Sequence, residues 1–315
     1  MAEPSREPAL HQLPVDEARR RAEQRAVEAS GGGDQTVVVE PREILSRHGA
    51  TIPMRAYRPN TGGTADTGEG GLIVFLHGGG WVYGSLASHD GMCRDLAADS
   101  ECVVVAVDYR LAPEHPFPAG LEDAHDVLDW ALSGAGGLVA DPARVAVAGD
   151  SSGGNLAAAA CLARRDAGAP GPGFQLLLYP CLDLTLSQPS MVQAEGRRFG
   201  GQTEIAWTVE RYLAGRADPR HPLVSPLWAD DHAGLPPAHV VTAGYDPLVD
   251  EGRAFVRALD LAGVTVSHRH YEQQIHGFLS FAGILPEARR ALADAARVTA
   301  DGLRPRPPGP SDDVR

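Results

Sequence analysis

Two adjacent serines, Ser151 and Ser152, lie in the glycine-rich stretch GDSSGG at residues 149–154, directly after the apolar run RVAVAG. A serine on a sharp turn between a strand and a helix exposes its hydroxyl, which can then attack a carbonyl carbon. Such a turn requires small residues two positions before and after the nucleophile. Gly149 and Gly153 occupy these positions for Ser151, whereas one of the positions around Ser152 would be Asp150. We therefore predict Ser151 as the nucleophile, with a plain glycine-rich turn as the alternative.

A second glycine-rich segment, HGGG at residues 77–80, follows the apolar run LIVFL. Attack on a carbonyl produces an oxyanion, which backbone N–H groups stabilise where no side chain crowds them. We expect the amides of Gly78, Gly79 and Ser152 to form this oxyanion hole. A phosphate-binding loop is the weaker alternative, because the chain has neither lysine nor the spacing G-x-G-x-x-G in this segment.

Asp246 and His276 each follow a predicted strand, at the sheet edge where α/β proteins place active groups. His276 would take the proton of Ser151, and Asp246 would orient the imidazole ring. Asp250, four residues further on, is a second candidate for the acid, although it is more typical of the following helix. The order serine, aspartate, histidine along the chain is that of α/β hydrolases.

Composition excludes other chemistry. The 315 residues include 28 basic side chains, all arginine, and 41 acidic ones, which gives a net charge of −13. Without lysine the chain can form no Schiff base and no Walker phosphate loop. The net negative charge disfavours a nucleic-acid partner. Ser-His-Asp chemistry needs neither a metal nor an organic cofactor, so we expect none.

The chain also lacks the signals of export or membrane insertion. We see no signal peptide and no apolar run of about 18 residues, the length that spans a membrane. Four cysteines without a C-x-x-C pair predict buried, reduced thiols. We therefore expect a cytoplasmic protein that does not enter a membrane.

The elements that must position these residues alternate along the chain. Apolar strands near residues 71–77, 102–108, 144–150, 174–180 and 238–244 alternate with helices, and a strand over 264–272 and a helix over 286–302 follow. This pattern predicts an α/β fold with a mostly parallel sheet covered by helices on both faces. Two further strands precede it within residues 36–57. Residues 14–29 predict a helix whose arginines at 19–21 form a solvated face.

The motifs together resemble the hormone-sensitive lipase family of α/β-hydrolases, the bacterial type IV carboxylesterases. They are HGGG, DYRLAPEHPFPA at 108–119, GDSSGGN, DPLVDEG and IHGF. The resemblance implies an eight-stranded sheet, a catalytic domain over 34–182 and 226–302, and a helical cap over 1–33 and 183–225. It also implies Ser151, Asp246 and His276 as the triad. Ser152 stands where the family often has alanine, and Val249 where it often has a charged residue.

Other segments have weaker interpretations. Trp81, Val82, Phe199, Trp207 and Tyr212 are candidates for lining the substrate pocket or, equally, for packing of the cap. His268, His270 and Glu272 alternate on one strand face, which a metal could use, but a solvated strand edge is favoured. The edge strand at 264–272 could pair two copies into a homodimer. Residues 60–71 predict a mobile loop, and residues 303–315 a disordered tail.

We therefore predict a serine esterase that acts through an acyl-enzyme on soluble short- to medium-chain or bulky esters. One alternative is a deacetylase or acyl-transfer enzyme of a specialised metabolite, which would use the same motifs. Another is a ligand sensor without catalytic activity, like the plant gibberellin receptor, which has lost the catalytic histidine. The presence of His276 in IHGF argues against the sensor.

Overall fold

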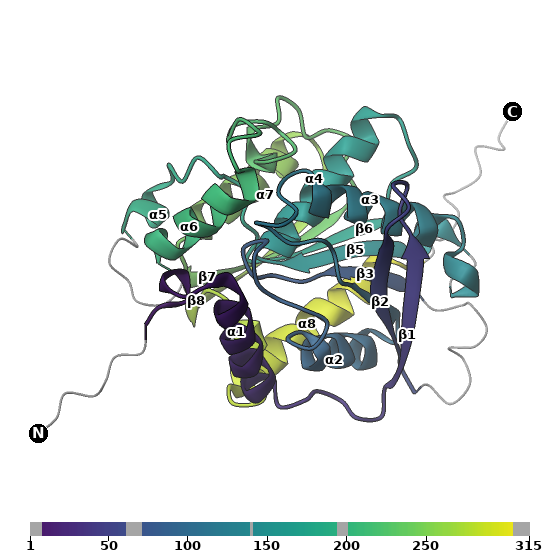
Figure 1. Cartoon of the computed structure of the whole chain (residues 1–315). Helices are drawn as coiled ribbons and strands as arrows, with labels where there is room; N and C mark the ends of the chain where they lie inside the picture. Colours follow the sequence, from purple (N-terminus) through teal and green to yellow (C-terminus); the bar gives the residue numbers. More distant parts are fainter. Residues whose placement is uncertain (1–7, 61–70, 139–140, 194–200, 305–315) are drawn as a thin grey trace, which may run out of the picture.

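One eight-stranded sheet crosses the molecule in the computed structural model, which describes residues 8–60, 71–138, 141–193 and 201–304 (Figure 1). The strands lie in the order β1-β2-β4-β3-β5-β6-β7-β8. Their bounds are β1 (Val38–Leu45), β2 (Thr51–Arg58), β3 (Leu72–Leu76), β4 (Val103–Val107), β5 (Val145–Asp150), β6 (Phe174–Leu178), β7 (Ala238–Tyr245) and β8 (Val266–Ile275). β2 is antiparallel to both β1 and β4, and the six strands β3 to β8 are parallel to one another. The predicted fold class is thus confirmed.

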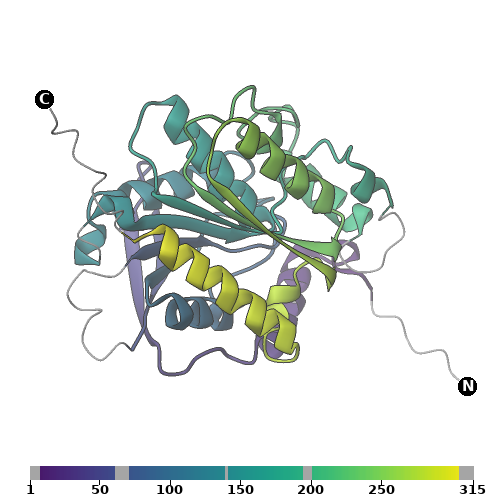
Figure 2. The same ribbon diagram turned by 180° about the vertical axis from the view of Figure 1, so that it is seen from behind.

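Helices cover both faces of the sheet (Figures 1 and 2). One face carries α3 (Ala119–Leu132), α4 (Ser152–Asp166) and α7 (Val249–Leu261), and the other carries α2 (Asp90–Ser100) and α8 (Pro286–Gly302). Side chains of β3 divide between the two cores: Val74 packs with the first set of helices, whereas Phe75 packs with the second. Because β3 is buried on both faces, its sequence is continuously apolar rather than alternating.

The remaining helices lie beside the carboxyl ends of the strands: α1 (Val15–Ser30), α5 (Pro189–Gln193) and α6 (Gln202–Leu213) (Figure 1). Short 3-10 turns complete the described part: η1 (Leu10–Gln12), η3 (Ala135–Gly137), η4 (Pro142–Arg144), η5 (Pro226–Trp228) and η6 (Phe278–Phe281).

Helix α1 is held to the rest of the molecule near both of its ends. The apolar side chains of α1 are mostly alanine, so polar contacts matter for its docking. Arg19 donates hydrogen bonds to the carbonyl oxygens of Val82, at 2.8 Å, and Ala112, at 2.9 Å, and pairs with Glu114. At the other end, the Gly283 amide donates to the Ala29 carbonyl at 3.1 Å. The expectation that Arg19 belongs to a solvated face was therefore wrong, because carbonyl groups on neighbouring loops recruit its guanidinium.

The predicted helix at 14–29 and the strands within 36–57 are confirmed as α1, β1 and β2. All four cysteines are buried and free. The predicted tail begins too early, because Leu303 is 2% exposed and belongs to the core on the side of α2 and α8. Residues 61–70 and 305–315, which cover most of the predicted loop and tail, lie outside the described residues. Among the described residues, no helix is both long and apolar enough to cross a membrane.

Candidate active site

Ser151 stands alone between strand β5 and helix α4, on the turn that the sequence predicts. Its φ of 52° and ψ of −115° lie outside the helical and extended regions, so the backbone is strained there. The turn brings Gly149 so near Gly153 that a Cβ on Gly149 would lie 2.3 Å from the Gly153 carbonyl carbon. A Cβ on Gly153 would lie 1.9 Å from the Leu76 carbonyl oxygen. Both glycines are required by close backbone contacts.

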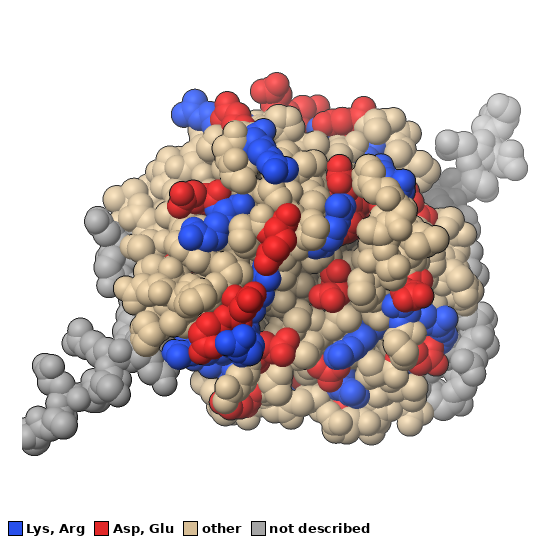
Figure 3. All heavy atoms as spheres, in the orientation of Figure 1, with Lys and Arg blue, Asp and Glu red and all other residues tan. Residues whose placement is uncertain are grey.

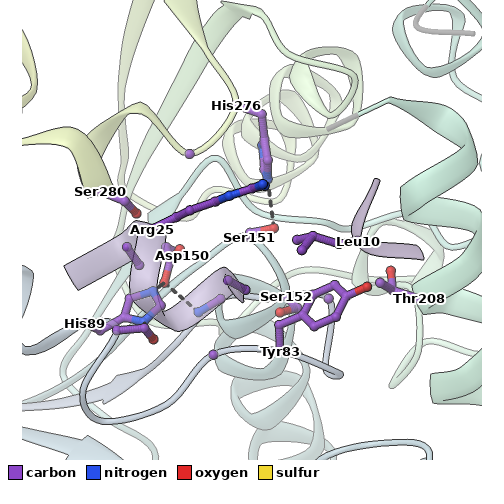
Figure 4. A pocket seen from close by; sticks show the side chains of 18 of the residues that line it. Leu10, Arg25, Tyr83, His89, Asp150, Ser151, Ser152, Thr208, His276 and Ser280 are labelled. Atoms are coloured by element: carbon purple, nitrogen blue, oxygen red, sulfur yellow. Dashed lines mark hydrogen bonds and ion pairs between the residues drawn. The ribbon is translucent and has the colours of Figure 1, made fainter. Parts of the chain in front are cut away.

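His276 and Asp246 converge on Ser151 from the ends of two other strands. Ser151 Oγ lies 3.0 Å from His276 Nε2 (Figure 4). His276 Nδ1 lies 2.9 Å from Asp246 Oδ2. Asp246 is 2% exposed. Asp250 is directed elsewhere, since its Oδ2 accepts a hydrogen bond from the Ser190 amide at 2.9 Å. The structure thus brings together the three predicted side chains and leaves the second candidate acid out.

Burial opposes protonation of His276, but the negative charge of Asp246 and its hydrogen bond outweigh burial and raise the pKa of the imidazole above its ordinary value. Asp150 and Glu204 add to this increase. An imidazole with a raised pKa is a better proton acceptor, and its protonated form is stabilised by the buried carboxylate. The arrangement can therefore remove a proton from Ser151 and hold it.

One of the three amides expected to form the oxyanion hole, that of Gly78, is already bonded within the protein. The Gly78 amide already donates a hydrogen bond of 2.7 Å to Asp150 Oδ1, so it does not provide a free N–H for an oxyanion. Gly79 and Gly80 have φ values of 121° and 61°, which glycine adopts readily. In the part of the chain that the structure describes, no hydrogen bond occupies the amides of Gly79, Gly80 or Ser152. These three N–H groups are the ones left for an oxyanion.

A cavity of about 550 Å³ opens in front of Ser151 (Figure 4). Beside Ser151, His276 and the glycine loop, its lining comes from α1 and the turn before it, from α6, and from the segment after His276. The apolar members are Leu10, Ala22, Ala26, Ala29, Ile205, Leu248, Phe281 and Ile284, and the charged side chains of the helices are Arg25, Glu28 and Glu204. The cavity is large enough for a small ester, and its walls are mainly apolar.

The predicted pocket side chains divide between the cavity wall and packing. Trp81 lines the cavity and stacks on Tyr212, with ring centroids 4.3 Å apart. Tyr212, Val82 and Trp207 are not part of the lining of this cavity. The ring of Trp207 stacks on Tyr83 instead, at 5.8 Å. These side chains pack the helices against the glycine loop. Phe199 lies outside the described residues.

Sequence reasoning missed several residues of the site. Tyr83, Arg25, Thr208 and Ile284 line the cavity, and His89 forms an ion pair with Asp150. A histidine nine residues after the HGGG segment is a signal that could have been noted for His89. For the others only the folded chain brings the segments together.

Metal binding has no structural support within the described residues, where no group of three histidine, cysteine or acidic side chains gathers. His268 and His270 both lie within hydrogen-bond distance of Thr242 Oγ1, at 2.8 and 2.9 Å.

Arginine and acidic side chains are interspersed over the face seen in Figure 3, without a continuous basic patch.

The fold and the Ser-His-Asp geometry define an α/β hydrolase. The sequence profile of the α/β hydrolase fold family matches residues 73–280, and the chain belongs to this family. It is 43% identical to the carboxylic ester hydrolase LipN of Mycobacterium tuberculosis, over 82% of this chain and 69% of the relative. It is 37% identical to the ethyl acetate hydrolase of Pseudomonas putida, over 90% and 89%.

Solved structures give the same result. A hyperthermophilic esterase from Pyrobaculum calidifontis superposes with a TM-score of 0.84 at 40% identity, covering 93% of this chain and 95% of the other. An ester hydrolase from the metagenome of Lake Arreo, solved in complex with a bipyridine phosphonate derivative, gives a TM-score of 0.88 at 40% identity, with coverage of 94% and 92%.

Proposed function

We propose that the protein is a serine carboxylesterase with Ser151 as nucleophile, His276 as general base and Asp246 as the residue that orients His276. The observation that carries the proposal is the continuous line of hydrogen bonds from Ser151 Oγ through the imidazole to Asp246, with distances of 3.0 and 2.9 Å. His276 Nε2 accepts the serine proton while Ser151 Oγ attacks the ester carbonyl. The imidazolium then protonates the leaving alcohol, and water repeats the cycle on the acyl-enzyme to release the acid.

The oxyanion donors that we propose are the amides of Gly79, Gly80 and Ser152. Ser152 is the first residue of α4, so its N–H points out of the positive end of the helix dipole. Gly78 is replaced in this role because its amide bonds to Asp150. In this proposal the Gly78 amide fixes the loop instead, and Gly79 and Gly80 face the substrate.

We also propose that residues 1–33 and 183–225 act as a cap over a catalytic domain formed by 34–182 and 226–302. Support comes from α1 and α6, which supply Ala22, Arg25, Ile205 and Thr208 to the cavity wall. A mainly apolar cavity of about 550 Å³ favours short- to medium-chain or bulky neutral esters. The relative named ethyl acetate hydrolase is in agreement with small esters.

The experiment that tests the function is an activity panel of p-nitrophenyl esters with acyl chains of two to sixteen carbons, together with lactones and N-acetylated amides. We expect hydrolysis of short and medium esters, with Ser151→Ala as the inactive control. A purified wild type that hydrolyses none of them would contradict the proposal.

A second candidate is removal of an acetyl group from a specialised metabolite, by hydrolysis or by transfer to an acceptor. A relative named acetyl-hydrolase from Streptomyces hygroscopicus, 36% identical over 75% of this chain and 79% of the relative, favours this candidate. Acetate release from O- or N-acetylated compounds, measured against the simple acetate esters of the panel, distinguishes the two. The interpretation as a ligand sensor is disfavoured, because His276 lies within reach of Ser151.

Dimerisation and location remain predictions. β8 is the outer strand of the sheet, so the edge at 264–272 is available to pair with a second copy. Size-exclusion chromatography with light scattering tests this. Four free, buried cysteines suit a reducing compartment such as the cytoplasm.

A further inference from the structure

A buried carboxylate lies next to the nucleophile and takes no part in the steps above. Asp150 directly precedes Ser151 and is 5% exposed. Its Oδ1 accepts a hydrogen bond from the Gly78 amide at 2.7 Å and lies 3.1 Å from His89 Nε2 (Figure 4). A single carboxylate oxygen thus connects the glycine loop to a histidine from the segment before α2.

The surroundings of His89 supply an acceptor for each ring nitrogen. Ser88 Oγ lies 2.9 Å from the Ser85 carbonyl, to which it donates its only proton, and it accepts the Ser85 amide at 2.9 Å. His89 Nδ1, 2.8 Å from Ser88 Oγ, is then the donor of that contact. His89 Nε2 faces a carboxylate, which can only accept. Both nitrogens of His89 therefore meet acceptors, which is the arrangement that suits an imidazolium.

We propose that His89 is a positioning residue: its positive charge neutralises Asp150, so that Asp150 can hold the Gly78 amide and the glycine loop without adding a net negative charge beside the Ser151–His276 pair. This inference rests on the proposed esterase function. It assigns to His89 a role in the reaction that is exerted through Asp150 and not through contact with substrate.

The chemistry of ester attack explains why compensation is needed. The tetrahedral intermediate develops negative charge in front of the loop that Asp150 holds. If the charge of Asp150 were not compensated, it would repel this developing charge and raise the activation barrier of ester attack. Burial alone disfavours the charged form of Asp150, but the charge and hydrogen bond of His89, together with the Gly78 amide, hold the pKa of Asp150 below its ordinary value. The carboxylate is thus ionised and paired.

The other titratable groups beside His89 are His77 and Asp90, and neither of them neutralises Asp150. The ring of His77 lies 5.5 Å from that of His89, and burial followed by the charge of His89 lowers the pKa of His77 to about 4. His77 is therefore neutral at ordinary pH. Asp90, the next residue in the chain, pairs with Arg55 and Arg94. Of these groups, His89 is the one that pairs with Asp150.

The charge of the Asp150–His89 pair affects the pKa of His276. The groups that influence His276 are Asp246 in direct contact, then Asp150 and Glu204, each of which raises its pKa. The ring of Tyr179 contacts it edge-on at 5.1 Å. Arg25 and Glu28 of α1 line the same cavity. An unpaired Asp150 would raise the pKa of His276 further, and the acid limb of the activity profile would follow it to higher pH, because catalysis needs neutral His276.

The test is the pH profile of kcat/KM for His89→Gln, Asp150→Asn and the double variant with a short p-nitrophenyl ester. Glutamine keeps a donor toward Asp150 but removes the charge. We expect the acid limb of His89→Gln to move up by about one pH unit, the order of magnitude of the effect of one unit charge on a neighbouring group inside a protein. We expect kcat to fall more than KM rises. In Asp150→Asn the carboxylate that pairs with His89 is gone, so in this proposal both charges of the pair disappear together and the acid limb stays within about half a unit. The neutral double variant recovers the wild-type limb.

The opposite pattern overturns the proposal: an unchanged limb in His89→Gln and a downward shift of about one unit in Asp150→Asn, which would mean that His89 is neutral. If His89→Gln fails to fold, the ¹⁵N shifts of the His89 ring in the wild type decide, because they are similar for both nitrogens in an imidazolium and far apart in a neutral ring.

The matched control is His232→Gln, which removes another buried histidine that bonds to the Pro226 carbonyl away from the cavity. It should lower stability and leave the limb in place. A wild type without any ester hydrolysis would refute the esterase function, while the ring ¹⁵N shifts would still report on His89.

Discussion

Replacing Asp246 with asparagine tests the electrostatic core of the site, and the structure sets the orientation of the new side chain. Asp246 Oδ1 accepts a hydrogen bond from the Leu248 amide at 2.8 Å, whereas Oδ2 faces His276 Nδ1. The asparagine oxygen must take the Oδ1 place, because only an acceptor can meet that amide. Its NH2 group then donates to His276 Nδ1 and forces the ring proton onto Nε2, which can no longer accept the proton of Ser151.

Two losses combine in the Asp246→Asn variant. The charge-assisted hydrogen bond that stabilises the imidazolium contributes about 1.5–3 kcal/mol, a factor of about 10–150 in rate. The wrong tautomer adds to this, and removal of an equivalent carboxylate in serine proteases lowers kcat by about 10⁴. We therefore expect kcat to fall by about 10³–10⁴, with KM changed less than tenfold. Without the Asp246 charge the pKa of His276 falls, so the acid limb of the residual activity moves to lower pH.

The assay is initial-rate hydrolysis of p-nitrophenyl butanoate between pH 5 and 10, with the spontaneous rate subtracted. Asp250→Asn is the matched control: it lies four residues further on, bonds to the Ser190 amide, and should keep most of the activity. The reasoning is refuted if Asp246→Asn retains kcat within tenfold of wild type, or if Asp250→Asn is the variant that loses it.

Three further predictions follow from packing and charge. Gly153→Ala would place a Cβ 1.9 Å from the Leu76 carbonyl oxygen, so we expect at least a 100-fold loss in kcat/KM, and a rate within threefold of wild type would contradict the close contact. Arg19→Met removes the ion pair to Glu114 and the hydrogen bonds to two backbone carbonyls. We expect the melting temperature to fall by about 2–6 °C and KM to rise. An unchanged melting temperature would show that these contacts do not hold α1 in place. Burial raises the pKa of Glu251 well above 4.5, so Glu251 stays protonated in the folded state, and the protein loses stability as pH rises past 4.5. In the wild type the free energy of unfolding, measured with urea, should therefore fall by up to about 1.4 kcal/mol per pH unit between pH 5 and 7, and Glu251→Gln should remove this dependence. The same pH dependence in both proteins would contradict this.

The sequence indicated most of the fold because local patterns determine it. Strands such as β3 and β5 are buried on both faces, so their sequences are unbroken apolar runs that stand out from the helices between them. The turn at Ser151 was predictable for a related reason. Its glycines meet nearby backbone at distances that exclude any side chain, and such a demand leaves a short, recognisable motif.

The errors arose where a contact depends on residues distant in the sequence. Gly78 was expected to be an oxyanion donor, but Asp150, 72 positions away, takes its amide. Arg19 was expected to be solvated, but the carbonyls of Val82 and Ala112 bind it. Trp207 was a candidate for the pocket and stacks on Tyr83 instead. Local pattern carries no information about such partners, because only folding brings them together.

The most direct test of the account is covalent trapping of the nucleophile. The protein is incubated with a p-nitrophenyl alkylphosphonate, which serine hydrolases attack in place of an ester, and the modified peptide is located by mass spectrometry. We predict one phosphonyl group on Ser151, loss of esterase activity in proportion to labelling, and no labelling of Ser151→Ala. Labelling at Ser152 or elsewhere, or activity that persists in Ser151→Ala, would contradict the assignment of Ser151 as the nucleophile.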